Sequence, residues 1–279
     1  MIRIFGDTTS GLTLEQAKSL GIEFIPQLII FGEKTYRDDT ELDPVEFVKK
    51  LEASPTLPKT AAPPPALYTE IFEDMYDKGD SAIIICPSSG LSGTVRSATT
   101  AKADFPALDI RVVDTKGMGS TEAVLLADAV RMRGEGKTLD EIEAAITEKA
   151  SRGKLLALVD TLEYLHKGGR IGNAAKFFGD ILQLKPILTL EDGIVTAHEK
   201  QRTKKKALAR MVELLQETCP DLKAGDFAID TRPNNPDTED LIAVLKEKFG
   251  VDDIPVYNAP ACLMVHAGPG VIIFDYFTK

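Results

Sequence analysis

The chain has 279 residues, 43% hydrophobic and 27% charged, which is enough apolar material for one large or two ordinary domains. Its formal net charge of −10 argues against a general binder of nucleic acid or of anionic membranes. The three cysteines lack CxxC spacing, so they predict neither a disulfide framework nor a metal site. No signal peptide and no membrane-spanning apolar run is evident, so we expect a cytoplasmic protein without stable membrane insertion.

The first half of the chain alternates strands with helices, the pattern of a mainly parallel sheet that is covered on both faces. Strands are predicted at residues 2–6, 24–31, 82–86 and 109–113. Helices are predicted over residues 13–21, 119–133 and 138–150. Three further helices have one predicted end each: one begins at residue 43, one ends at residue 79 and one begins at residue 95. Residues 54–65 hold five prolines and are predicted to form a stiff extended loop.

The pattern changes near residue 152, after which hairpins and helices are mixed. The predicted elements are a strand at 154–159, a short helix at 160–167, a hairpin at 186–199 with its turn at 191–193, helices at 202–218 and 237–249, and strands at 227–230, 254–257 and 271–277. The predicted fold class is therefore α/β. It comprises an N-terminal three-layer α/β/α domain with a mainly parallel sheet, residues 1–152, and a C-terminal α+β domain, residues 153–279.

A turn rich in hydroxyl groups and glycine, Ser88-Ser89-Gly90-Leu91-Ser92-Gly93-Thr94, follows the buried strand at 82–86. The helix after it begins with unpaired N–H groups and the positive end of its dipole, so the turn is a candidate anion site. It lacks the lysine of a phosphate-binding loop, and Thr94 stands where a nucleophile elbow ends in glycine. A plain turn with Ser92 or Thr94 as helix cap is the alternative interpretation.

Other polar side chains stand at positions where they could bind a ligand. Thr60 carries a single hydroxyl in the stiff loop, and Arg170 follows two glycines that could hold its guanidinium against an anion. His266 lies in a predicted tight turn before the last strand. Three residues of this part of the site have a structural alternative: Thr60 as a loop end, His266 as a structural side chain, and Lys167 as a solvated cation at a helix end.

Several of these segments together resemble the DegV family, the fatty-acid-binding proteins that include the lipid-binding subunits of bacterial fatty acid kinase. The matching segments are residues 7–10, Thr60, residues 88–97, 114–115, 160–172, 185–188, 199–206 and 266–270. The stretches SSGLSGT and DTLEYLHKGGRIG carry most of the specificity.

The resemblance implies a long-chain fatty acid held between the two domains, with no metal, no cofactor and no catalytic residue of the chain's own. The partner it implies is a separate ATP-dependent fatty acid kinase of the dihydroxyacetone-kinase type, which would phosphorylate the bound carboxylate for phospholipid synthesis. The implied ligand-binding residues are Thr60, Ser92, Gly93, Thr94 and His266. Arg170 and Lys167 are implied to be supporting or partner-facing.

One segment departs from the family pattern. Ala61-Ala62-Pro63-Pro64 stands where the family often has Ser-Gln-Pro-Ser, so two polar side chains are missing near the expected head group.

Two other functions stay open at this point. The first is a stand-alone serine esterase or phosphotransferase with Ser92 as nucleophile, although no His/Asp pair can be assigned to it from sequence. The second is a regulatory or DNA-binding protein, which only the basic run at residues 199–206 would support.

Overall fold

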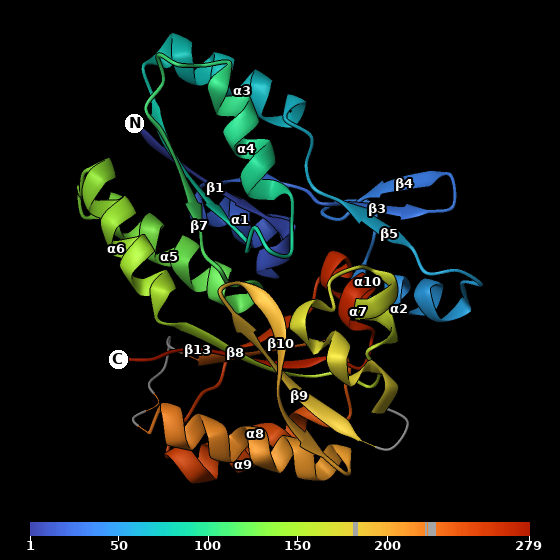
Figure 1. Ribbon diagram of the computed structural model, residues 1–279. Coiled ribbons are helices and arrows are strands. Elements are labelled where there is room, and N and C mark those ends of the chain that lie inside the picture. The colour runs from blue at the N-terminus through green and yellow to red at the C-terminus, as the bar shows by residue number, and fades with distance from the viewer. Residues whose placement is uncertain (181–183, 221, 223–226) are drawn as a thin grey trace.

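The computed structural model describes residues 1–180, 184–220, 222 and 227–279, whose strands form three sheets (Figure 1). The first sheet is parallel throughout, in the order β2 (Ile22–Ile25), β1 (Ile2–Asp7), β6 (Ser81–Cys86), β7 (Ile110–Asp114). On one face lie α3 (Ala66–Lys78) and α4 (Thr94–Ala103); on the other lie α1 (Leu14–Leu20), α5 (Ser120–Gly134) and α6 (Leu139–Ser151). The predicted three-layer arrangement around a parallel sheet is confirmed.

The second sheet is formed from the C-terminal half of the chain. Its order is β10 (Ile194–Gln201), β9 (Lys185–Glu191), β8 (Gly153–Leu158), β13 (Ile272–Phe277), β11 (Phe227–Thr231), β12 (Val256–Asn258). Neighbouring strands are antiparallel except β11 and β12. The helices α8 (Lys204–Thr218) and α9 (Thr238–Phe249) cover one face, at the bottom of Figure 1. The predicted mixture of hairpin and helices is confirmed.

Strand β8 shows how the sequence builds two cores, because successive side chains of a strand point to opposite faces. Leu156 and Leu158 pack with α8 and α9, whereas Leu155 and Ala157 belong to a second core on the other face. That second core is closed by α2 (Pro44–Ala53), α7 (Glu163–Lys167) and α10 (Ala261–Ala267).

The prediction of one strand over residues 24–31 is wrong, because the chain changes sheets there. β2 ends at Ile25, and β3 (Leu28–Phe31) belongs to a third, antiparallel sheet in the order β4 (Lys34–Arg37), β3, β5 (Lys59–Ala61). Pro26 has no N–H for a strand ladder, which explains the break. The stiff loop of residues 54–65 holds β5, where Thr60 pairs with Ile29.

The predicted tight turn around His266 is also corrected. His266 lies in the last turn of α10, a helix that follows Pro260 and ends at Gly268. The helix begins with a short apolar run, Ala261–Val265, that is buried throughout. Such a run is too short for periodicity to separate helix from strand.

Two short 3-10 segments complete the described elements, η1 (Thr8–Ser10) and η2 (Gly172–Asp180). Within the described residues, no helix combines the length and the apolar character needed to cross a membrane.

The division of the chain into two domains at residues 152/153 stays a prediction. Ile29 of β3 and Phe47 of α2, both from the N-terminal half, are part of the core against β8 and β13.

Candidate functional site

Two polar turns meet at the centre of the first sheet. The chain leaves β1 toward β2 on one side, whereas β6 and β7 lie on the other, so the sheet changes winding direction between β1 and β6. Residues 7–10 follow β1 and residues 87–94 follow β6. Ligands of open α/β sheets bind at the carboxyl ends of the strands at such a point.

An apolar cavity extends from these turns to the inner face of the second sheet. It encloses about 880 Å³ of atom-free space, its open mouth included. Its apolar walls include Leu155, Ala157, Leu188, Val195, Val271 and Ile273. Gln27, Thr60, Ser92, Arg170 and His266 supply polar groups to the lining.

Ser92 and Gly93 line the cavity, and Thr94 lies directly behind them as a buried residue. The Ser92 hydroxyl is 2.8 Å from Thr94 Oγ1 and accepts the Thr94 N–H at 3.3 Å. The N–H groups of Leu91 and Ser92 both donate to the Ser88 carbonyl, so part of the predicted anion site is used within the turn itself. The hydroxyl of Ser92 therefore faces the cavity with a fixed partner behind it.

Thr60 and His266, 206 residues apart, meet at the cavity wall, with Thr60 Oγ1 2.7 Å from His266 Nε2. The Nδ1 atom of His266 is buried without a hydrogen-bond partner among the described residues. Burial, and then the nearby Arg170 charge, lowers the pKa of His266 to about 4, so the ring is neutral at pH 7. Gly168 permits this position, because a Cβ there would lie 2.3 Å from Nδ1.

Arg170 joins the hydroxyl-rich turn to the segment after α7. Its Nε donates to Leu91 O at 3.0 Å and its Nη1 to Gly168 O at 2.8 Å. Arg170, Thr60 and His266 also line a second hollow, which is bordered by residues 54–60 and Lys167 and opens on the outside of the molecule. Lys167 borders only this outer hollow and pairs with Glu163, so the structure does not bring it to the cavity.

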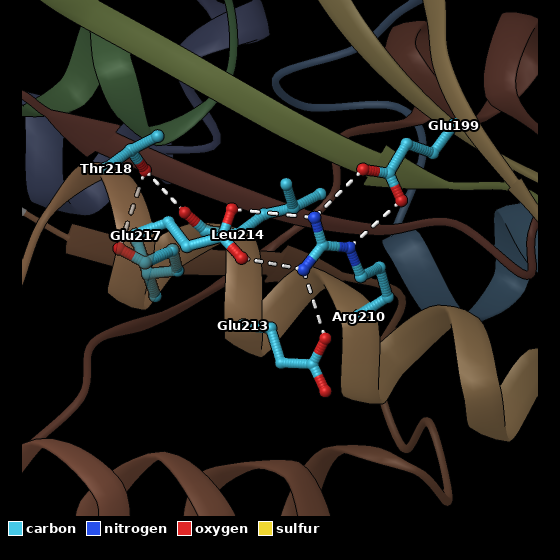
Figure 2. Close-up of polar contacts among 7 residues, drawn as sticks. Glu199, Arg210, Glu213, Leu214, Glu217 and Thr218 are labelled. Atoms are coloured by element: carbon cyan, nitrogen blue, oxygen red, sulfur yellow. Dashed lines mark hydrogen bonds and ion pairs between the residues drawn. The ribbon is translucent and has the colours of Figure 1, made fainter.

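Residues of the basic run at 199–206 contact several different side chains. Glu199 binds the guanidinium of Arg210, which Glu213 and Glu217 also contact (Figure 2). Lys204 pairs with Asp237, and Lys200 lies over the ring of Phe177. Two cations of the run, Lys200 and Lys204, are thus engaged with other side chains of the protein.

The hairpin β9–β10 reaches up to the hydroxyl-rich turn (Figure 1). The Ser88 hydroxyl donates to the carbonyl of Gly193, at the hairpin tip, at 2.8 Å. Gly193 has φ 77°, and a Cβ there would lie 2.1 Å from Ser88 Oγ, so only glycine permits this contact. One hydrogen bond thus ties the tip of the second sheet to the turn of the first.

Sequence reasoning missed the groups behind Thr94. Asp7 Oδ2 accepts hydrogen bonds from Thr94 Oγ1 at 3.0 Å and from Gln27 Nε2 at 2.6 Å. Glu122, in the first turn of α5, shares Thr9 with Asp7. Asp7 lies in residues 7–10, one of the segments that carry the family resemblance, but the sequence assigned it no role in the site; nothing in the sequence around Glu122 signals its burial. Among the described residues, no group of three or more acidic, histidine or cysteine side chains could hold a metal ion.

The fold and site together define a class: an α/β protein with an apolar cavity between two sheets and polar groups in the cavity wall. A family model described as "Uncharacterised protein, DegV family" matches residues 1–279. A DegV domain-containing protein of Halalkalibacterium halodurans is 31% identical over 279 residues, which cover 100% of this chain and 99% of that one. The chain belongs to the DegV family.

Two solved structures share the architecture. A fatty acid binding DegV family protein of Streptococcus agalactiae superimposes with a TM-score of 0.92 at 27% identity, covering 100% of this chain and 99% of the other. A DegV family protein of Eubacterium eligens, loaded with heptadecanoic acid, gives a TM-score of 0.84 at 26% identity, with 100% of both chains covered. The first is thus described as fatty acid binding, and the second as loaded with a fatty acid.

Proposed function

We propose that this chain binds a long-chain fatty acid, with the acyl chain in the apolar cavity and the carboxyl group beside Ser92, Thr60 and His266. The observation that carries the proposal is a cavity with apolar walls that also presents a small set of polar groups. Each buried methylene contributes about 0.8 kcal/mol, so an acyl chain supplies most of the affinity. The hydroxyl groups offset the cost of burying the head group. The descriptions of the S. agalactiae relative as fatty acid binding and of the E. eligens relative as loaded with heptadecanoic acid support the same ligand class.

We further propose that the chain presents this carboxyl group to a separate kinase. The outer hollow supports the idea, because Thr60, Arg170 and His266 border both the cavity and the hollow. In such a reaction a carboxylate oxygen attacks the γ-phosphorus of ATP in line and gives an acyl phosphate. The kinase, the acyl phosphate, its use in phospholipid synthesis and the cytoplasmic location all stay predictions.

Native mass spectrometry of freshly purified protein, with extraction of bound lipid, tests the ligand. We expect about one fatty acid per chain. Protein that is empty and also refuses added fatty acids would contradict the proposal. That outcome would direct attention to Ala62, which lines the cavity at a position where the family resemblance implies a polar side chain.

Arg170→Ala tests the presenting role. We expect the variant to retain bound fatty acid but to lower acyl-phosphate formation by a purified fatty acid kinase about 100-fold, because the charge that borders the outer hollow is lost. Arg131→Ala, a change on the exposed surface of α5 outside the linings of both the cavity and the outer hollow, is the matched control. Full acyl-phosphate output from Arg170→Ala would exclude the role.

The hydrolase alternative finds no support in the geometry. The hydroxyl of Ser92 contacts Thr94, and the histidine of the site contacts Thr60 instead. A serine nucleophile requires a base within hydrogen-bond reach.

A further inference from the structure

A chain of hydrogen bonds runs from the interior of the first sheet to the cavity wall. Glu122 Oε2 lies 2.7 Å from Thr9 Oγ1, which also contacts Asp7 Oδ1. Asp7 Oδ2 lies 3.0 Å from Thr94 Oγ1, and Thr94 Oγ1 lies 2.8 Å from the hydroxyl of Ser92. Both carboxyl groups are buried, with 2% and 0% of Asp7 and Glu122 exposed. The described residues offer neither of them a lysine, arginine or histidine as ion-pair partner.

Counting hydrogens at Thr9 shows that the carboxyl pair holds a proton. Thr9 has one hydroxyl hydrogen but contacts an oxygen of each carboxyl group, so both contacts are hydrogen bonds only when one carboxyl is protonated. Asp7 also accepts from Thr9 N at 2.7 Å and from Gln27 Nε2, so the negative charge belongs on Asp7 and the proton on Glu122. Burial raises the pKa of both groups, and that of Glu122 well above its usual value.

Counting hydrogens at Thr94 fixes which groups donate and which accept along this chain of hydrogen bonds. Gln27 Nε2 donates to Thr94 Oγ1 at 2.9 Å, and the single hydrogen of Thr94 goes to the charged Asp7. Ser92 must then donate its own hydrogen to Thr94. Since Ser92 Oγ already accepts the Thr94 N–H, what remains for the cavity is a lone pair.

We propose that Asp7 is a positioning residue that makes Ser92 a hydrogen-bond acceptor, so that the cavity takes the fatty acid head group as the neutral carboxylic acid. The inference rests on the proposed fatty acid function. An ionised fatty acid takes up one proton from solvent on binding; its new O–H donates to Ser92 Oγ. Its carbonyl oxygen accepts from Thr60, whose hydrogen is free when His266 carries its proton on Nε2, the nitrogen that has a partner.

The surroundings of Asp7 agree with this assignment. The titratable groups that face it are Glu122 on α5, Asp38 after β4, Tyr68 on α3, Cys86 on β6 and Cys262 on α10. All of these are acidic or neutral. Across the cavity stand the neutral His266 and Arg170, whose guanidinium is already bonded to Leu91 and Gly168.

The same chain explains how the acid could later be ionised for phosphoryl transfer. The acid O–H would pass its proton to Ser92, Ser92 its own to Thr94, and Thr94 its own to Asp7. The carboxylate is then free to act as nucleophile, and the proton rests on Asp7. No other reactant is needed for this step.

The test uses tetradecanoic acid labelled with ¹³C at its carboxyl carbon, bound to the delipidated full-length protein and followed by NMR from pH 5 to 8. The ¹³C shift reports the protonation of the head group directly. We expect the bound label to remain protonated at pH 7, which places its pKa at least two units above the free acid's value of about 4 to 5. A bound label that is ionised throughout this range would overturn the inference while leaving fatty acid binding intact.

Variants separate positioning from a merely structural role. In Thr94→Val, Ser92 has no acceptor behind it and can donate to the ligand, so we expect the bound label to be ionised at pH 7. Asp7→Asn removes the charge that orients this chain of hydrogen bonds, so we again expect the bound label to be ionised at pH 7. Thr94→Ser keeps a hydroxyl at this position and should titrate like the wild type. Thr100→Val, an exposed change on the same helix, should also leave the titration unchanged.

Two results would contradict the inference in different ways. A protonated label in both Thr94→Val and Asp7→Asn would show that the chain does not set the head group's protonation. Wild-type protein that binds no label at all would overturn the fatty acid function, and this inference with it.

Discussion

Replacing Ala157 with phenylalanine should abolish most binding of long acyl chains while leaving the fold intact. Ala157 lies on β8 with its side chain in the cavity wall, opposite Leu188 and Ile273 in the neighbouring strands. A ring at this position fills space that an acyl chain would occupy. Displacing about four methylenes, at about 0.8 kcal/mol each, costs roughly 3 kcal/mol, or about 100-fold in Kd.

Fluorescent displacement or calorimetry with acids of different length measures this effect. Octanoic acid serves as an internal control, because a short chain reaches less of the cavity and should lose less affinity. Val244→Phe, an added ring on the exposed surface of α9, is the matched variant. Equal losses for short and long acids in Ala157→Phe would show that the acyl chain does not run past β8.

The second large effect we expect is a fall in stability as pH rises from 5 to 8. Asp230 and Asp275 are fully buried beside each other and accept hydrogen bonds from Ser120. Burial raises the pKa of both, and that of Asp275 well above its usual value; burial likewise raises the pKa of Asp38 to about 6.

The sign follows from which state holds the protons. Above about pH 4 the unfolded chain loses protons that the folded protein keeps, so the free energy of unfolding falls by about 1.4 kcal/mol per pH unit for each such group. The loss continues until pH reaches the folded-state pKa. For Asp38 the window is from about pH 4 to 6, and for Asp275 it extends further.

Urea denaturation at each pH gives the free energy of unfolding. Asp275→Asn should flatten the slope and be more stable than the wild type at pH 8, since a neutral amide replaces a carboxyl that resists ionisation. Asp104→Asn, an exposed position after α4, should keep the wild-type slope. A wild-type protein whose stability is constant between pH 5 and 8 would contradict the raised pKa values.

The sequence predicted those parts of the fold that depend on local patterns. The alternation of strands and helices predicted the parallel sheet, and the helices predicted over residues 13–21 and 138–150 begin in the structure at capping boxes formed by Thr13 and Thr138. The change of sheet at Pro26 and the helix of His266 were not predicted, because each depends on what the segment packs against. Periodicity in so short a segment does not report its packing.

The residues of the candidate site also differ in whether the sequence could identify them. Ser92, Thr60, Arg170 and His266 were selected from turns and glycines, and the structure brings all four to one cavity. Whether they bind the ligand stays a prediction. Glu122 could not have been selected, because its role depends on burial against Asp7, 115 residues earlier in the chain.

The walls of the cavity come from almost the full length of the chain, from Thr9 to Ile273. Contacts between residues so far apart form late in folding, because the entropy of closing long loops opposes them until other structure is in place. A ribosome must also release nearly the entire chain before the last wall, strand β13, can be added. Helices and parallel strands of the first half can form early during synthesis, but a ligand can bind in the cavity only after the whole chain has folded.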